Sequence, residues 1–107
     1  MKFIKTIEDL DTKARNKGEA KINGRMRYAF GEVGDLEEKY KVVNDGKTVE
    51  LYHWGTRTLV LNLDNGEVVE FYGESNSDRD SINTMLYLHN INSKARYRPS
   101  IDLFELV

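Results

Sequence analysis

The sequence predicts an α+β domain, in which an antiparallel β-meander of five to seven strands carries two short helices packed on one face. Three observations lead to this prediction: turn dipeptides flanked by strand-like runs, alternating apolar positions within those runs, and two segments with helical spacing. At 107 residues the chain has the length of one domain, and we expect residues 1–107 to form it. With 39% apolar residues it is too hydrophobic to be disordered.

Three dipeptides predict hairpin turns: Asn23-Gly24, Asp45-Gly46 and Asn65-Gly66. Asn or Asp followed by Gly is preferred in type I′ turns, because both central residues take positive φ there. Each dipeptide lies between runs rich in β-branched and aromatic residues. The strand pairs expected are 20–22 with 26–30, 40–43 with 48–52, and 59–63 with 68–72.

Alternation within these runs predicts a sheet with one buried face. Two triplets of alternate residues share a face in this way: Val49, Leu51 and His53 in one strand, and Leu59, Leu61 and Leu63 in another. Residues 31–38 are expected to form a solvated loop within the sheet. Residues 96–107 return to an extended pattern with a break at Pro99, which predicts a final edge strand. The apolar end of this strand would allow two copies to pair edge to edge, so the expected state is a monomer or a homodimer.

Two segments have helical spacing. We expect Thr6 to be the N-cap of the first helix and Gly18 to end it, and we expect Ser77 to be the N-cap of the second. Because short helices are marginal alone, both should pack an apolar stripe on the sheet. The stripes are Ile7, Leu10 and Ala14 in the first helix, and Ile82, Met85, Leu86 and His89 in the second.

Charge is unevenly distributed along the chain, although its net value is only −2. Residues 1–30 hold eight Lys or Arg and four Asp or Glu, residues 31–80 hold five and twelve, and residues 81–107 hold three and two. A solvated surface with both signs interspersed is one explanation. A second is an acidic central surface that enters a positively charged channel of another macromolecule.

A third explanation is a basic surface that neutralises the phosphates of nucleic acid. Its candidates are Lys13, Arg15, Lys17, Lys21, Arg25, Arg27, Lys94, Arg96 and Arg98. The isoelectric point near 5.7 favours the acidic explanation over this one, because nucleic-acid-binding domains usually carry a strong basic excess.

Signals for catalysis are few. The chain has no cysteine, which excludes thiol nucleophiles and Cys-type zinc sites, and it has no HExxH, P-loop or G-x-G-x-x-G motif. For His53 and His89, packing or hydrogen bonding is favoured over catalysis. We therefore expect no enzymatic activity, no cofactor and no metal site.

One segment is dense in the residues that protein interfaces favour. Residues 52–57 hold Tyr, His, Trp and Arg between two strands, and residues 73–79 lead into the second helix. We expect these two loops to meet at one end of the sheet, with Trp54, Tyr52, Arg57, Ser75 and Arg79 presented together. The alternative is that Trp54 only fills the gap between sheet and helix.

The pattern of these loops resembles small domains of bacteriophages, plasmids and other mobile elements. The residues that carry the resemblance are Tyr52-His53-Trp54-Gly55-Thr56, then Gly73, Ser75, Ser77-Asp78-Arg79 and Ile82-Asn83, then Tyr97, Pro99 and Ser100. It covers residues 48 to 100 and implies a context rather than a chemistry, since no catalytic residue carries over. Small proteins of this kind include anti-CRISPR and other anti-defence inhibitors.

Together these observations predict a non-enzymatic protein that binds and sterically inhibits a host defence complex, with a CRISPR effector nuclease as the expected target. The partner would be a host protein or ribonucleoprotein. A nucleic-acid-binding accessory protein is the alternative. We expect no membrane association and a cytoplasmic location, because no apolar run is long enough for a span and the N-terminus lacks signal-peptide features. The expected partner-binding residues are Asp35, Glu37, Glu38, Tyr52, Trp54, Arg57, Glu67, Glu70 and Tyr72.

Overall fold

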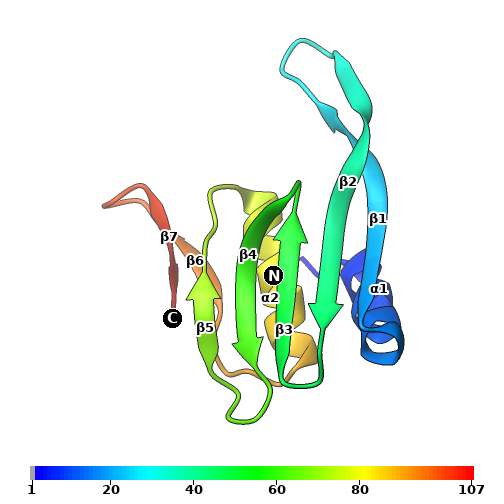
Figure 1. The fold of residues 1–107 in the computed structure, drawn as a ribbon. Coiled ribbons are helices and arrows are strands. Elements are labelled where there is room, and N and C mark those ends of the chain that lie inside the picture. The colour runs from blue at the N-terminus through cyan, green and yellow to red at the C-terminus, as the bar shows by residue number, and fades with distance from the viewer. Residues whose placement is uncertain (1) are drawn as a thin grey trace.

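The computed structural model describes residues 2–107 and has the predicted α+β architecture (Figure 1). Strands β1 to β5 form one antiparallel sheet in chain order, and β6 and β7 form a separate two-stranded sheet. No helix in the described range is long and apolar enough to cross a membrane. The elements are α1 (Lys5–Lys17), β1 (Glu19–Arg27), β2 (Val33–Asn44), β3 (Thr48–His53), β4 (Thr56–Asn62), β5 (Val68–Phe71), α2 (Asn76–Leu88), β6 (Ala95–Arg98) and β7 (Leu103–Leu106).

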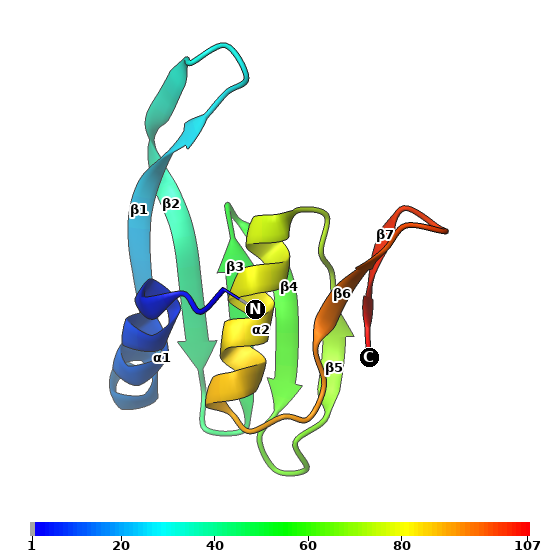
Figure 2. The same cartoon turned by 180° about the vertical axis from the view of Figure 1, so that it is seen from behind.

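Both helices lie on the same side of the sheet, as predicted. Figure 2 shows α2 across the back of β3 and β4, with α1 beside β1 and the end of β2. Ile82, Met85 and Leu86 of the α2 stripe are fully buried against the face that holds Leu51 and Leu59, whereas His89 at its end is partly buried. Complete burial of such a side chain contributes about 1.5–3 kcal/mol. This contact provides the hydrophobic core.

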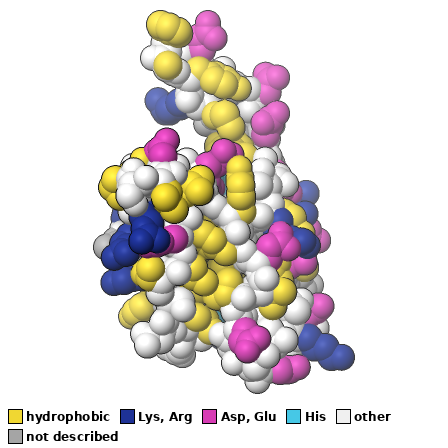
Figure 3. Space-filling model, turned by 90° about the vertical axis from the view of Figure 1, so that its left-hand side faces the viewer, with side chains coloured by type: hydrophobic (Ala, Val, Ile, Leu, Met, Phe, Trp, Pro, Cys, Tyr) yellow, Lys and Arg dark blue, Asp and Glu magenta, His cyan; other side chains and the backbone are white. Residues whose placement is uncertain are grey.

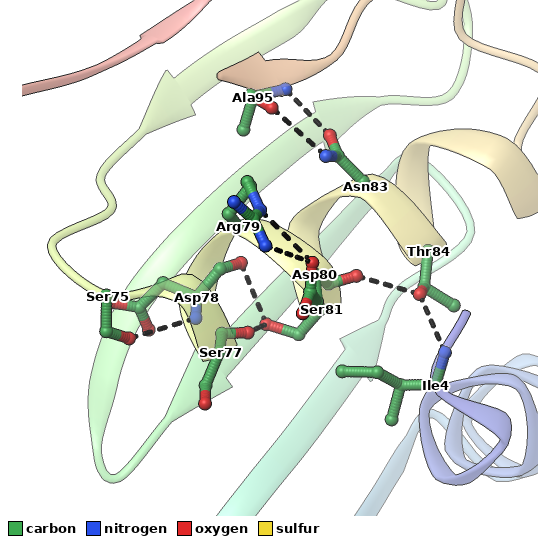
Figure 4. Close-up of polar contacts among 10 residues, drawn as sticks. All are labelled: Ile4, Ser75, Ser77, Asp78, Arg79, Asp80, Ser81, Asn83, Thr84 and Ala95. Atoms are coloured by element: carbon green, nitrogen blue, oxygen red, sulfur yellow. Dashed lines mark hydrogen bonds and ion pairs between the residues drawn. The ribbon is translucent and has the colours of Figure 1, made fainter. Parts of the chain in front are cut away.

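The predicted N-caps of both helices are wrong. The N-cap of α1 is Ile4, whose backbone N–H donates to Thr84 Oγ1 at 3.0 Å and so fixes the start of α1 to α2. The N-cap of α2 is Ser75, whose Oγ accepts from the Asp78 N–H at 3.1 Å (Figure 4). Gly18 ends α1 at φ 88°, as expected from its freedom to take left-handed conformations.

Two of the three predicted hairpins are confirmed, and the first is wrong. Strand β1 continues through Asn23 and Gly24, which pair with Glu38 and Glu37, and the chain turns only at residues 28–32. A Cβ on Gly24 would lie 3.0 Å from Lys39 Cδ, so this glycine permits close approach of a side chain rather than a turn. Of the loop expected at 31–38, only residues 31 and 32 lie in the turn, and residues 33–38 form the first half of β2.

The type I′ turn of this sheet lies where no Asn-Gly or Asp-Gly dipeptide occurs. Trp54 and Gly55 connect β3 to β4 with φ values of 51° and 80°. At 45–46 and 65–66 only the glycine has positive φ, so those connections are of another type. A bulky residue at positive φ is uncommon and strained. The Trp54 N–H donates to Lys39 O at 2.8 Å, which ties this turn to β2.

Lys39 is also where β1 and β2 leave the sheet. Their pairing shifts register there, and the last pair between β2 and β3 joins Tyr40 to His53. Residues 23–38 continue as a two-stranded ribbon that has no third strand, which we call the arm. Six β2 residues beyond the bulge extend it by about 20 Å at roughly 3.3 Å per residue. Figure 1 shows the arm projecting past the end of the sheet.

The expected single edge strand at 96–107 is wrong, because the chain reverses at residues 99–102 and forms the β6–β7 hairpin. One side chain of α2 holds this hairpin. Asn83 Nδ2 donates to Ala95 O at 3.1 Å, and the Ala95 N–H donates to Asn83 Oδ1 at 2.7 Å (Figure 4). Both partners are buried.

We predict that Asn83→Ala lowers the free energy of unfolding by about 2–3 kcal/mol, because it leaves the buried N–H and C=O of Ala95 without partners. Urea unfolding measures the effect, and Asn92→Ala is the control because Asn92 is exposed. Equal stability of the two variants would contradict the anchoring role of Asn83.

Candidate functional site

The acidic residues proposed for partner binding fall into two groups. Asp35, Glu37 and Glu38 lie on the arm. Glu67 and Glu70 lie at the β4–β5 turn and on β5, and the turn is at the opposite end of the sheet from the arm (Figure 1). The structure therefore does not bring all five into one surface.

The sheet face that faces away from the helices carries charges of both signs. Arg57 pairs with Glu50 at 3.4 Å and with Glu70 at 2.7 Å, and the Tyr52 hydroxyl donates to Glu50 at 2.9 Å. Lys41 Nζ lies 4.5 Å from the centre of the Tyr52 ring. This face is a ladder of mutually neutralised groups, and it contradicts the expectation of a continuous anionic central surface.

The arm differs from that face because its charges are unpaired. None of its four acidic side chains, Glu32, Asp35, Glu37 and Glu38, forms an ion pair within residues 2–107. Large apolar side chains precede these acids or alternate with them in the sequence and face solvent, and Phe30 is 96% exposed. In Figure 3 yellow side chains cover much of the arm, with magenta acidic groups beside them. The other exposed apolar side chains are Tyr28, Val33 and Leu36.

The basic residues proposed for nucleic acid are also divided. Those on α1 and β1 lie on one side of the molecule, and those at β6 lie on the other (Figure 1). Arg96 and Arg98 both pair with Glu105, and Arg15 pairs with Asp11. The structure does not place the set along one stripe.

A pocket of about 660 Å³ lies at the base of the arm. The arm contributes Met26 and Arg27, and the β3–β4 turn contributes His53 and Trp54. The opposite wall comes from the connection between β5 and α2 and from the first turn of α2, including Ser75. The two loops that the sequence places at one end of the sheet therefore do meet there.

The expected cluster within these loops is only partly correct. Trp54, Ser75 and Tyr72 line the pocket. Tyr52 and Arg57 belong instead to the ladder on the sheet face, because alternate residues of a strand point to opposite faces.

Arg79, expected in the same cluster, pairs with Asp80 at 3.1 Å. It follows the N-cap Ser75 by one helical turn and lies outside the residues that line the pocket.

A buried hydrogen bond forms the floor of the pocket. His53 Nδ1 donates to Asp78 Oδ1 at 2.6 Å, and this side-chain contact links the end of β3 to the start of α2. The His53 ring stacks on Tyr40 with centroids 4.6 Å apart and planes 11° from parallel. The Trp54 ring also lies near it, with centroids 5.9 Å apart and planes tilted by 31°. The hydrogen bond to Asp78 and the stacking on Tyr40 together fix the orientation of the imidazole.

Asp78 is held as a carboxylate. Burial raises its pKa, but the hydrogen bonds from His53 and from the Glu74 N–H, together with the charge of His53, outweigh burial and leave the pKa below the ordinary value. A carboxylate only accepts hydrogen bonds, so the proton between the two side chains belongs to Nδ1. In the neutral form of the ring, Nε2 therefore presents a lone pair.

The Nε2 atom opens into the pocket. Only 6% of the His53 side chain is exposed, and in the described chain its one hydrogen bond is through Nδ1. Yet no buried side-chain nitrogen or oxygen within residues 2–107 lacks a partner, so Nε2 must reach accessible space. His53 lines this pocket, which is where that space lies.

The site lacks other catalytic parts among the described residues. No hydroxyl group there hydrogen-bonds to His53 Nε2, so no nucleophile is paired with it. No group of three or more potential metal ligands occurs in the same range. His89 has the hydrogen-bonding role expected for it, since its Nε2 contacts Asp11 Oδ1 at 2.9 Å and joins the two helices.

Sequence reasoning missed the apolar tip of the arm and the contribution of Met26 to the pocket. Both errors follow from placing a turn at Asn23-Gly24. The apolar residues of the arm give the same alternation as a half-buried strand, and the sequence contains no sign that the helices end before they reach it.

No protein-family model, curated protein or solved structure matches this chain.

We predict that Trp54→Asn is more stable than Trp54→Ala by about 1 kcal/mol. Both variants remove the indole equally, but asparagine tolerates positive φ better than alanine. Thermal or urea unfolding measures the difference. A more stable alanine variant would show that the turn changes shape when the indole is lost.

We predict that Asp78→Asn lowers the free energy of unfolding at pH 7 by about 2 kcal/mol, because a charge-assisted hydrogen bond is lost. The Asp78 pKa is depressed in the folded state, so its contribution is present above about pH 4 and declines as the pH falls through the folded-state pKa. The gap between wild type and variant should therefore narrow from pH 7 to pH 2. Asp64→Asn, at an exposed position, should show no such trend in urea titrations.

Proposed function

We propose that this chain is a non-enzymatic binding protein that uses the arm to occupy a cationic surface of a larger macromolecular complex. The observation that carries this proposal is the arm itself, which exposes Tyr28, Phe30 and Leu36 next to acidic groups that have no ion-pair partner in the described chain. Exposed apolar clusters rimmed by charge are typical of protein interaction sites.

The chemistry of the arm favours a protein partner with a basic contact surface. Aromatic side chains supply contact area, and unpaired carboxylates supply orientation and a faster association rate. A ribbon that projects from the domain reaches into a channel that a flat face cannot enter. A standard protein–protein interface buries about 800 Å² per partner. On a domain this small, an interface of that area would include much of the arm.

The proposed partner is a host defence complex, and a CRISPR effector nuclease is the first to test. The support is the resemblance of residues 48–100 to mobile-element domains, together with the acidic arm. Such nucleases hold their nucleic acid in a positively charged channel, which an acidic ribbon blocks by occupying it. Inhibition in this mechanism is steric, and no bond is made or broken.

The test is cleavage of target DNA by a panel of purified RNA-guided effector complexes, with and without the chain. Inhibition of at least one of them supports the proposal, and no inhibition of any contradicts it. A gel shift with duplex and single-stranded DNA at low and high salt addresses the alternative. Tight, salt-sensitive binding by the isolated chain would favour the nucleic-acid-binding function instead.

We predict that Phe30→Ser weakens inhibition of the nuclease at least about tenfold, the scale of a residue at the centre of an interface.

We also predict that Asp35→Asn with Glu37→Gln weakens inhibition of the nuclease more than Asp64→Asn with Glu67→Gln does. Both double variants remove the same two charges, but only the first acts on the arm. Titration of the nuclease with each variant measures the effect, and equal losses would contradict the role of the arm.

A further inference from the structure

The pocket at the base of the arm has an acceptor that the fold leaves unused. His53 Nε2 belongs to a side chain that is more than nine-tenths buried, yet within the described chain it has no hydrogen-bond partner. Asp78 holds one proton of the ring at Nδ1, so Nε2 is an acceptor in the neutral form of the ring. A ligand that fills this position in that form must donate a hydrogen bond.

The remaining walls restrict the ligand further. Trp54 and Tyr72 provide aromatic surface, and Glu74 provides a carboxylate. Together with Asp78 these acids outnumber the one cation of the lining, Arg27, so the pocket is net negative while His53 is neutral. Such a site favours a cation that is also planar.

We infer that this pocket receives a guanidinium group, supplied by an arginine side chain of the protein partner. A guanidinium stacks on aromatic rings and presents several N–H donors in its plane, so it reaches Nε2 and Glu74 while covering Trp54. An ammonium group is a compact point charge that does not stack. The Arg27 side chain lines the pocket but forms no hydrogen bond or ion pair within residues 2–107, and no guanidinium of the described chain is hydrogen-bonded to His53 Nε2.

The backbone at Trp54 is a second, independent sign of a binding role. Asparagine, aspartate or glycine suits the first position of a type I′ turn, and tryptophan does not. Strained backbone of this kind clusters at ligand sites. The turn itself does not require tryptophan at this position, and the strained residue places its indole beside His53.

This inference rests on the proposed function for the source of the arginine, and it is tested without the partner. The probes are N-acetyl-argininamide, N-acetyl-lysinamide and N-acetyl-citrullinamide, titrated into the full chain. Trp54 is the only tryptophan, so indole fluorescence and the single indole N–H resonance both report the pocket. We expect saturable binding of the arginine probe and at least tenfold weaker binding of the lysine and citrulline probes.

Two variants identify the groups responsible. In His53→Asn an amide N–H replaces Nδ1–H toward Asp78, but the Nε2 acceptor is lost, and we expect at least fivefold weaker binding. Trp54→Asn keeps the turn and removes the aromatic wall, and we expect a similar weakening of binding. Backbone amide resonances measure it, because this variant has no indole. The inference would be overturned if the arginine and lysine probes bound equally well, or if both variants bound the arginine probe as tightly as the wild type. A change of the indole signal on titration with inorganic phosphate, in place of the arginine probe, would also overturn it.

The arm variant Asp35→Asn with Glu37→Gln separates this inference from the proposed function, because neither residue lines the pocket. We expect it to bind the arginine probe like the wild type. Arginine binding without inhibition of any nuclease would overturn the proposed function and leave the pocket assignment standing. Inhibition without arginine binding would do the reverse.

Discussion

Burial of α2 against β3 and β4 determines which part of the sheet is covered. The core ends where Tyr40 pairs with His53, because neither helix extends past that point and no residue from 23 to 38 belongs to the core or packs against it. Beyond the bulge at Lys39, β1 and β2 are held only by their own pairing. The arm and the pocket at its base both follow from this limit, since a sheet longer than its helical cover leaves apolar strand residues in solvent.

The sequence was sufficient for the fold class because the periodic residues are also the buried ones. Leu51 and Leu59 on the sheet and Ile82 on α2 stand at the spacings that their elements require, and all three are fully buried. Boundaries were predicted less well, because Ser75 and Ser77 are equivalent as local N-cap signals and only the tertiary position of Asp78 distinguishes them. The pairing of β1 with β2 was predicted wrongly at Gly24, because this glycine makes room for the Lys39 side chain and does not form a turn.

The candidate site was accessible to sequence reasoning only in outline. Proximity of the two loops follows from strand order, and the structure confirms it through the contact of His53 with Asp78. Tyr52 lies on the open sheet face and Trp54 lies at the pocket because of the turn between β3 and β4. The Trp-Gly dipeptide does not predict the conformation of that turn. The unpaired state of the arm's acids cannot be inferred from composition, because Glu50 and Glu70 look the same in sequence and are neutralised by Arg57.

The independence of the arm from the core has a consequence for how this protein changes over generations. Substitutions at Phe30 or Leu36 remove no core contact, so they alter the contact surface at little expense in folding free energy. The arm is thus one continuous stretch of the chain that holds no core residue. The surface of the arm can therefore change by substitution while the sheet and its two helices keep their packing.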